Sequence, residues 1–123
     1  MVRQARHKIL VVEDDLNLLN LYQKELEDEG FEVITTTGGD QAIELTKRAS
    51  PDLVILDIKL TKVPGLEVLR EIKAQDHKIP VILNSAYTTF KADFSSWLAD
   101  AYLIKSSDLT QLKRSIKKLL RLD

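Results

Sequence analysis

Four short apolar runs constrain the fold of this chain more than any other feature of its sequence. They cover residues 9–12, 53–56, 81–83 and 102–104, and they show no inner alternation of apolar and polar positions. Strands of this kind are buried on both faces, as in a parallel sheet. A fifth run, residues 31–35, mixes polar and apolar positions and indicates an edge strand.

Amphipathic stretches lie between these runs and predict five helices, over residues 16–29, 40–49, 66–74, 88–98 and 108–122. We expect the first helix to have Asp15 as its N-cap and to end before Gly30. The last opens with Asp108 and Gln111 at capping-box spacing. Regular alternation of strand and helix predicts an α/β fold, a doubly wound five-stranded parallel sheet, for which 2-1-3-4-5 is the common strand order.

The composition excludes several classes of function. The chain has 18 basic and 19 acidic residues, so it lacks the basic face that nucleic-acid binding requires. It contains no cysteine, which excludes disulfides and thiolate metal sites. Its basic N-terminus is followed by an apolar run too short for a signal peptide or a membrane span. We therefore expect a cytoplasmic protein that binds neither nucleic acid nor membrane.

Polar residues follow four of the predicted strands at their carboxyl ends: Glu13 and Asp14, Asp57, Ser85, and Lys105. Ligands of a doubly wound sheet bind beyond these ends, so we expect the five side chains to meet. Crowded carboxylates attract a cation, and an all-oxygen ligand set suits Mg²⁺ or Mn²⁺. With a lysine and a hydroxyl beside them, they form a site for a metal-bridged phosphate, in which an aspartate can act as the nucleophile toward phosphorus.

The same segments resemble the receiver domains of bacterial two-component response regulators. The resemblance rests on residues 8–15, 51–58 with 65–69, 80–86 and 101–105, in that order, each at a strand end. It extends from residue 8 to about residue 121. It implies that residues 1–123 form a single, stand-alone receiver domain of the CheY-like kind, with the flavodoxin-like receiver fold.

The resemblance also implies a function. Asp57 would accept a phosphoryl group from a sensor histidine kinase or a phosphotransfer protein, and the domain would then switch conformation to control a downstream protein partner. Glu13, Asp14 and Asp57 would hold the metal together with the backbone carbonyl of Lys59. Such a domain is a phosphoacceptor switch rather than an enzyme, because it catalyses only its own phosphorylation and dephosphorylation.

Further roles follow from the resemblance for residues around the phosphoacceptor. Ser85 would bind the phosphoryl oxygens in the active state, and Lys105 would pair with the phosphate. Tyr102 would be the aromatic residue that moves inward with the switch. The side chains of Lys59 and Tyr87 would flank the path of the hydrolytic water, and because both are bulky we expect slow loss of the phosphoryl group.

The sequence departs from the family pattern at two positions, and it leaves competing functions open. Thr61 and Ser106 stand where the family usually has prolines, which affects the geometry of loops beside the site. One alternative is a pseudo-receiver that only binds partners. Another is a flavodoxin-like carrier or an aspartate-nucleophile phosphatase, although the latter would usually carry a second aspartate where Lys59 stands. The aromatic stripe of Phe90, Phe94 and Trp97 belongs to the core or to a docking surface.

Overall fold

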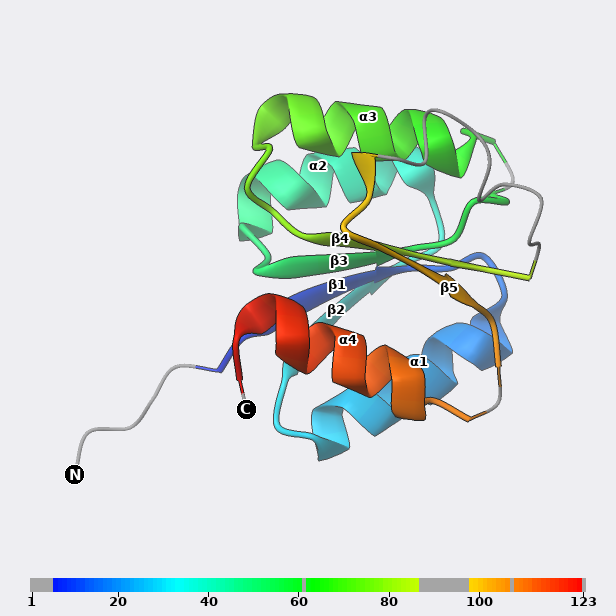
Figure 1. Ribbon diagram of the computed structural model, residues 1–123. Helices are drawn as coiled ribbons and strands as arrows, with labels where there is room; N and C mark the ends of the chain where they lie inside the picture. Colours follow the sequence, from blue (N-terminus) through cyan, green and yellow to red (C-terminus); the bar gives the residue numbers. More distant parts are fainter. Residues whose placement is uncertain (1–5, 61, 87–97, 107, 123) are drawn as a thin grey trace.

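The computed structural model describes residues 6–60, 62–86, 98–106 and 108–122 (Figure 1). Five parallel strands form one sheet in the order β2-β1-β3-β4-β5, as predicted. The strands are β1 (Lys8–Val12), β2 (Glu32–Thr36), β3 (Leu53–Leu56), β4 (Val81–Ser85) and β5 (Ala101–Ile104). The helices within the described ranges are α1 (Leu16–Asp28), α2 (Gly39–Ala49), α3 (Gly65–Gln75) and α4 (Thr110–Leu120).

The sheet is covered on both faces, which explains why its central strands are apolar throughout. Helices α2 and α3 lie on one face, and α1 and α4 lie on the other (Figure 1). Strands β1, β3 and β4 contribute alternate side chains to two core clusters, one on each face. In the part of the chain that the structure describes, no helix has the length and apolarity needed to cross a membrane.

The ends of α1 follow the predicted signals. The carboxylate of Asp15 accepts hydrogen bonds from the backbone N–H groups of Asn17 and Leu18, at 2.9 and 3.3 Å. Gly30 follows the C-cap residue with a φ of 97°, the left-handed conformation that glycine adopts without steric cost. This confirms Asp15 as a helix cap.

Two predictions about the C-terminal part were wrong. Helix α4 begins at Thr110, and the Asp108 carboxylate accepts from the backbone N–H and hydroxyl of Thr110, at 3.0 and 2.6 Å, instead of forming a capping box with Gln111. Strand β5 is not buried on both faces, because it forms the edge of the sheet and Ile104 is 42% exposed. The helix predicted over residues 88–98 lies outside the described residues except for Leu98.

A polar contact holds the beginning of β4, at the edge of the sheet opposite the predicted site. The Asp100 carboxylate accepts from the backbone N–H of Val81 at 2.8 Å and from the Lys73 ammonium at 2.7 Å. The same ammonium donates to the carbonyl oxygen of Ile79 at 2.8 Å. The first residue of β4 is therefore tied both to the segment before β5 and to α3.

Candidate functional site

Backbone pairing continues past the strand ends and sets the positions of three of the predicted site residues. The Glu13 N–H donates to the Thr36 carbonyl, and the Asp57 N–H donates to the Val12 carbonyl, both at 3.1 Å. The Lys105 N–H donates to the Ser85 carbonyl at 2.7 Å. Residues 13, 57 and 105 therefore stay in register with the sheet, and their side chains are brought to its carboxyl edge.

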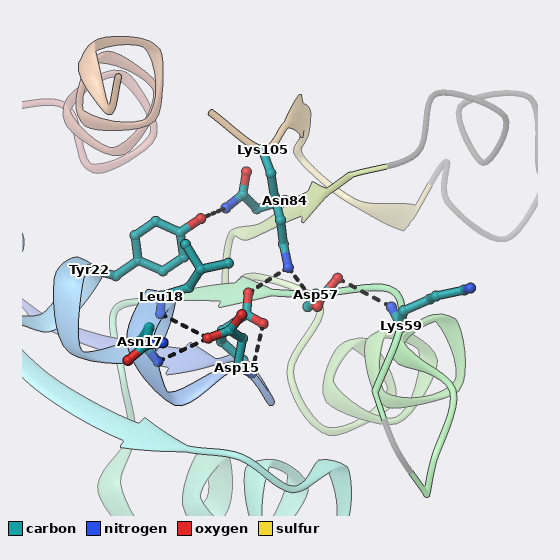
Figure 2. Close-up of polar contacts among 9 residues, drawn as sticks. Asp15, Asn17, Leu18, Tyr22, Asp57, Lys59, Asn84 and Lys105 are labelled. Carbon is teal, nitrogen blue, oxygen red and sulfur yellow. Dashed lines mark hydrogen bonds and ion pairs between the residues drawn. The ribbon is translucent and has the colours of Figure 1, made fainter. Parts of the chain in front are cut away.

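Lys105 joins two buried carboxylates. Its ammonium nitrogen lies 2.7 Å from Glu13 Oε1 and 2.9 Å from Asp57 Oδ2 (Figure 2). Glu13 and Asp57 are only 2% and 4% exposed, so this ion pair is largely shielded from water. Sequence reasoning placed Lys105 and the carboxylates at the same edge of the sheet but assigned no ion pair between Lys105 and Glu13, because strand spacing does not show how far a long side chain reaches.

Burial and the ion pair shift two pKa values in the site. Burial raises the pKa of Glu13, and the hydrogen bonds from Lys105 and from the Asp15 N–H oppose this effect. Burial lowers the pKa of Lys105, but its hydrogen bonds to Asp57 and Glu13 outweigh burial and leave that pKa raised overall. Lys105 is therefore firmly cationic, and its charge compensates part of the carboxylate charge around it.

The three predicted acidic ligands come together. One carboxylate oxygen from each of Glu13, Asp14 and Asp57 lies within 4.8 Å of the others, and Asp14 is the exposed member. Carboxylate oxygens are the ligands that hard divalent cations such as Mg²⁺ and Mn²⁺ prefer. With one open side toward solvent, the donor set fits an ion that keeps several of its waters.

The loop after β3 approaches α3 so closely that one position tolerates no side chain. The Gly65 N–H donates to the Ile58 carbonyl at 2.8 Å. A Cβ atom on Gly65 would lie 2.2 Å from the carbonyl oxygen of Asp57. The Asp57 carboxylate also accepts a hydrogen bond from the Lys59 N–H at 3.2 Å. The conformation of the loop is therefore fixed both by this bond and by the close approach of Gly65.

Ser85 and Tyr102 lie on neighbouring strands and contact each other. Ser85 is the last residue of β4 and is fully buried, and Tyr102 is half-buried in β5. Burial raises the pKa of Tyr102, and a hydrogen bond with Ser85 opposes the shift. Of the other predicted residues, Lys59 is exposed, Ser106 accepts from the Asp108 N–H at 3.1 Å, and Tyr87 and Thr61 lie outside the described residues.

Sequence reasoning missed a buried polar pair beside the site. The side-chain amide of Asn84 donates to the Tyr22 hydroxyl at 2.9 Å (Figure 2). Tyr22 lies within the helix predicted over residues 16–29 and Asn84 directly precedes Ser85, but the sequence assigned a role to neither. The available signal was a polar residue in an otherwise apolar strand, since buried polar groups require partners.

Comparison with known proteins agrees with this geometry. A family model described as the response regulator receiver domain matches residues 9–117. The chain is 32% identical over 119 residues to the alkaline phosphatase synthesis transcriptional regulatory protein PhoP of Bacillus subtilis, covering 93% of this chain and 48% of that protein. It is 33% identical over 114 residues to the transcriptional regulatory protein ZraR of Escherichia coli, covering 91% of this chain and 26% of that protein. The chain thus spans about half or less of the length of these relatives.

Solved structures show the same similarity. The response regulator TrrA of Thermotoga maritima, in complex with Mg²⁺-BeF, is 41% identical with a TM-score of 0.89, covering 92% of this chain and 98% of TrrA. TrrA in complex with the histidine kinase ThkA gives a TM-score of 0.87, with 93% and 98% covered. The receiver domain of the Pseudomonas aeruginosa sensor kinase PA1611, with a magnesium ion in its active-site cleft, is 25% identical with a TM-score of 0.87, and 95% and 99% are covered.

Proposed function

Because this chain belongs to the response regulator receiver domains of two-component signal transduction systems, we propose that Asp57 is its phosphoacceptor. The donor would be a phosphohistidine on a sensor histidine kinase or a phosphotransfer protein. The observation that carries the proposal is the Lys105 ammonium held 2.9 Å from the Asp57 carboxylate, at the carboxyl edge of the sheet. TrrA, with 41% identity, has been solved in complex with a histidine kinase.

The proposed reaction needs little from the protein beyond positioning and charge neutralisation. A carboxylate oxygen of Asp57 attacks phosphorus, the P–N bond of the donor breaks, and its electron pair remains on the imidazole nitrogen. Lys105 already contacts the nucleophile and is cationic, so it can pair with the incoming phosphoryl oxygens without crossing the site. The backbone N–H of Lys59, which donates to Asp57 Oδ1, helps to orient the carboxylate.

We propose that Glu13, Asp14 and Asp57, with the backbone carbonyl of Lys59, hold Mg²⁺ or Mn²⁺. The convergence of the three carboxylates supports this assignment, as does the magnesium found in TrrA and PA1611. When bound, the ion would neutralise charge on the phosphoryl oxygens. The chain's own contribution is to hold buried Glu13 and Asp57 ready as ligands and to leave Asp14 open to water.

In this proposal Ser85 and Tyr102 form the switch. The Ser85 hydroxyl would bind a phosphoryl oxygen, and Tyr102 would move inward as Ser85 shifts. Their contact in adjacent strands supports the coupling, because displacement of Ser85 changes the surroundings of the Tyr102 hydroxyl. A downstream protein partner would then read the altered surface.

The side chains of Lys59 and Tyr87 are proposed to slow hydrolysis of the phosphoryl group by flanking the path of the attacking water. Replacing both with alanine should speed dephosphorylation, which we expect to take minutes or longer in the natural protein. Timed loss of the label after removal of the donor measures the rate. An unchanged half-life would contradict this role.

The wider setting is also part of the proposal. Residues 1–123 would act as one receiver unit in the cytoplasm. The absence of cysteine is compatible with this reducing compartment, because the protein has no disulfide bonds that could be reduced. The unit is a phosphoacceptor switch that works on itself rather than an enzyme with a turned-over substrate. Its partners are proteins rather than nucleic acid or membrane, in keeping with a net charge of −1.

Intact-mass measurement after incubation with phosphoramidate, with and without Mg²⁺, tests the proposal. We expect the mass of one phosphoryl group to be added only with the metal, and Asp57→Asn to abolish the addition. Asp52→Asn is the matched control, because Asp52 precedes the same strand at its opposite end. A chain that binds Mg²⁺ without gaining mass would instead be a pseudo-receiver, and sustained phosphate release over many turnovers would indicate a phosphatase.

A further inference from the structure

The proposed chemistry makes no use of Asn84 and Tyr22, although both are buried near the site. Asn84, in β4, is 5% exposed, and Tyr22, in α1, is 1% exposed. The Asn84 Nδ2 donates to the Tyr22 hydroxyl at 2.9 Å across 62 positions of sequence (Figure 2). Burying polar groups in an apolar core is unfavourable unless they are paired, and two apolar residues of similar shape would fold as well. The pair therefore calls for a reason beyond packing.

Asn84 lies on the same face of the sheet as the charged residues. Side chains alternate along a strand, so Asn84 points to the same face as Ile82, which packs in the core cluster beneath α1 and α4. By the same alternation Glu13, Asp57 and Lys105 point to that face, because each lies two positions after a strand residue that packs in or against the same cluster. The side chain of Asn84 therefore lies on the same face of the sheet as the three side chains of the ion pair.

Lys105 must extend across β4 to reach its partners. Strand β4 separates β5 from β3, yet the Lys105 ammonium contacts Asp57 after β3 and Glu13 after β1. Its aliphatic chain therefore passes over the end of β4 on the face that carries Asn84, and Figure 2 shows it extending past Asn84 toward Asp57. The pKa of Tyr22 also reflects how close the pair lies to the site. Burial is the main cause that raises this pKa, and the charges of Lys105, Glu13 and Asp57 also act on it.

Open space adjoins Asn84 on one side. A cavity of about 360 Å³ adjoins it, and its lining includes Tyr102, Leu103, Ser106, Leu109 and Leu112. A side chain with open space beside it is free to change rotamer unless a polar contact holds it. The hydrogen bond to Tyr22, on a helix that begins two residues after Asp14, supplies that contact.

We propose that Asn84, held by Tyr22, is a positioning residue for Lys105. The aliphatic chain of Lys105 would pack on the Asn84 side chain. Asn84 would thereby keep the ammonium group between Asp57 and Glu13 and prevent it from turning toward the cavity or solvent. The inference rests on the proposed function, in which Lys105 assists phosphoryl transfer to Asp57. It adds that the rate of this transfer depends on a hydrogen bond that touches neither the donor nor the metal ligands.

Two near-isosteric variants test the proposal, Tyr22→Phe and Asn84→Leu, together with the double variant. Each single change should lower the rate constant for Asp57 labelling by phosphoramidate by about tenfold to a hundredfold, where the upper figure is the loss expected when an assisting group is misplaced by about 1 Å. The double variant should be no slower than the singles, because one hydrogen bond cannot be broken twice. The affinity for Mg²⁺ should not fall, because all the metal ligands are kept and an ammonium that leaves Glu13 and Asp57 no longer competes with the metal for them.

Two further measurements separate positioning from loss of stability. Thr46→Val is the matched control, because Thr46 is a buried hydroxyl that donates to Ala42 at 2.8 Å in α2, away from the site, and its loss should leave labelling unchanged. In ¹H–¹⁵N spectra, the Lys105 ammonium should give a slowly exchanging signal in the natural protein and lose it in both single variants.

Natural labelling rates in both single variants would overturn the proposal. So would an equal slowing in Thr46→Val, a loss of Mg²⁺ affinity as large as the loss of rate, or an unchanged ammonium signal. Failure of the proposed function is distinguishable from these outcomes, because the natural protein would then not be labelled at all. The ammonium spectra would still report whether Asn84 positions Lys105.

Discussion

Methionine in place of Lys105 would keep most of the side chain's length and apolar contact while removing its ammonium group. The Glu13 and Asp57 carboxylates would then remain buried, at 2% and 4% exposure, without the cation that now lies 2.7 and 2.9 Å from them. Removing one partner of a buried ion pair typically costs about 3–5 kcal/mol of unfolding free energy. We expect a loss of this size at pH 8 in the absence of metal.

The loss should shrink as the pH falls. Burial already raises the pKa of Glu13, and removing Lys105 removes a contact that lowers it, so Glu13 in the folded variant will hold a proton at higher pH than in the unfolded chain. A group whose folded pKa is raised contributes stability below its unfolded pKa and loses it as pH rises through the folded value. Uptake of one proton should therefore recover up to about 1.4 kcal/mol per pH unit on acidification.

Urea unfolding at several pH values between about pH 4.5 and pH 8, with and without Mg²⁺, measures these effects. Lys113→Met is the matched control, because Lys113 lies 2.9 Å from Glu25 at the surface, where an ion pair is worth at most about 1 kcal/mol. Saturation with Mg²⁺ at a hundredfold its dissociation constant should return about 2.7 kcal/mol to the Lys105 variant. If both lysine variants lose the same stability, or if the loss does not grow with pH, our account of Lys105 is refuted.

Three other perturbations follow from the same geometry. Asp57→Asn should abolish phosphorylation and raise the metal-free melting temperature, because it removes one of three crowded charges; a lower temperature in a thermal scan would count against repulsion in the site. Gly65→Ala should cost more than about 2 kcal/mol in urea unfolding and slow labelling, since a Cβ would meet the Asp57 carbonyl at 2.2 Å; a variant of natural stability would show that the loop yields freely. Because the pKa of Glu13 is raised above its ordinary value of 4.5, Mg²⁺ affinity should rise with pH up to that raised value and then level off. Titration calorimetry at a series of pH values measures this affinity, and a flat profile above pH 4.5 would show that the pKa is not raised.

The sheet could be predicted from sequence because its information is local. Central strands buried on both faces are apolar throughout, and the mixed composition of residues 31–35 correctly placed β2 at an edge. Strand β5 was misjudged by the same rule. Its run of residues 102–104 is as apolar as a central strand, but strand order makes it an edge and leaves Ile104 exposed.

The site could be predicted only as far as strand ends determine it. The convergence of Glu13, Asp14 and Asp57 follows from topology, because neighbouring parallel strands end at the same edge. The bridge from Lys105 to Glu13 and the bond between Asn84 and Tyr22 do not follow. The first depends on how far the Lys105 side chain extends across β4, and the second on how closely α1 approaches the sheet. Neither can be inferred from the spacing of apolar residues in the sequence.

The anchoring of β4 at its first residue has a mechanical consequence. Because the Val81 N–H donates to Asp100, and Asp100 is paired with Lys73 of α3, that end of the strand is held in place. If Ser85 shifts in the proposed switch, we therefore expect its displacement to grow along the strand from this held end, instead of the whole strand sliding. Such a displacement would be largest at the carboxyl edge of the sheet, where β4 meets β5.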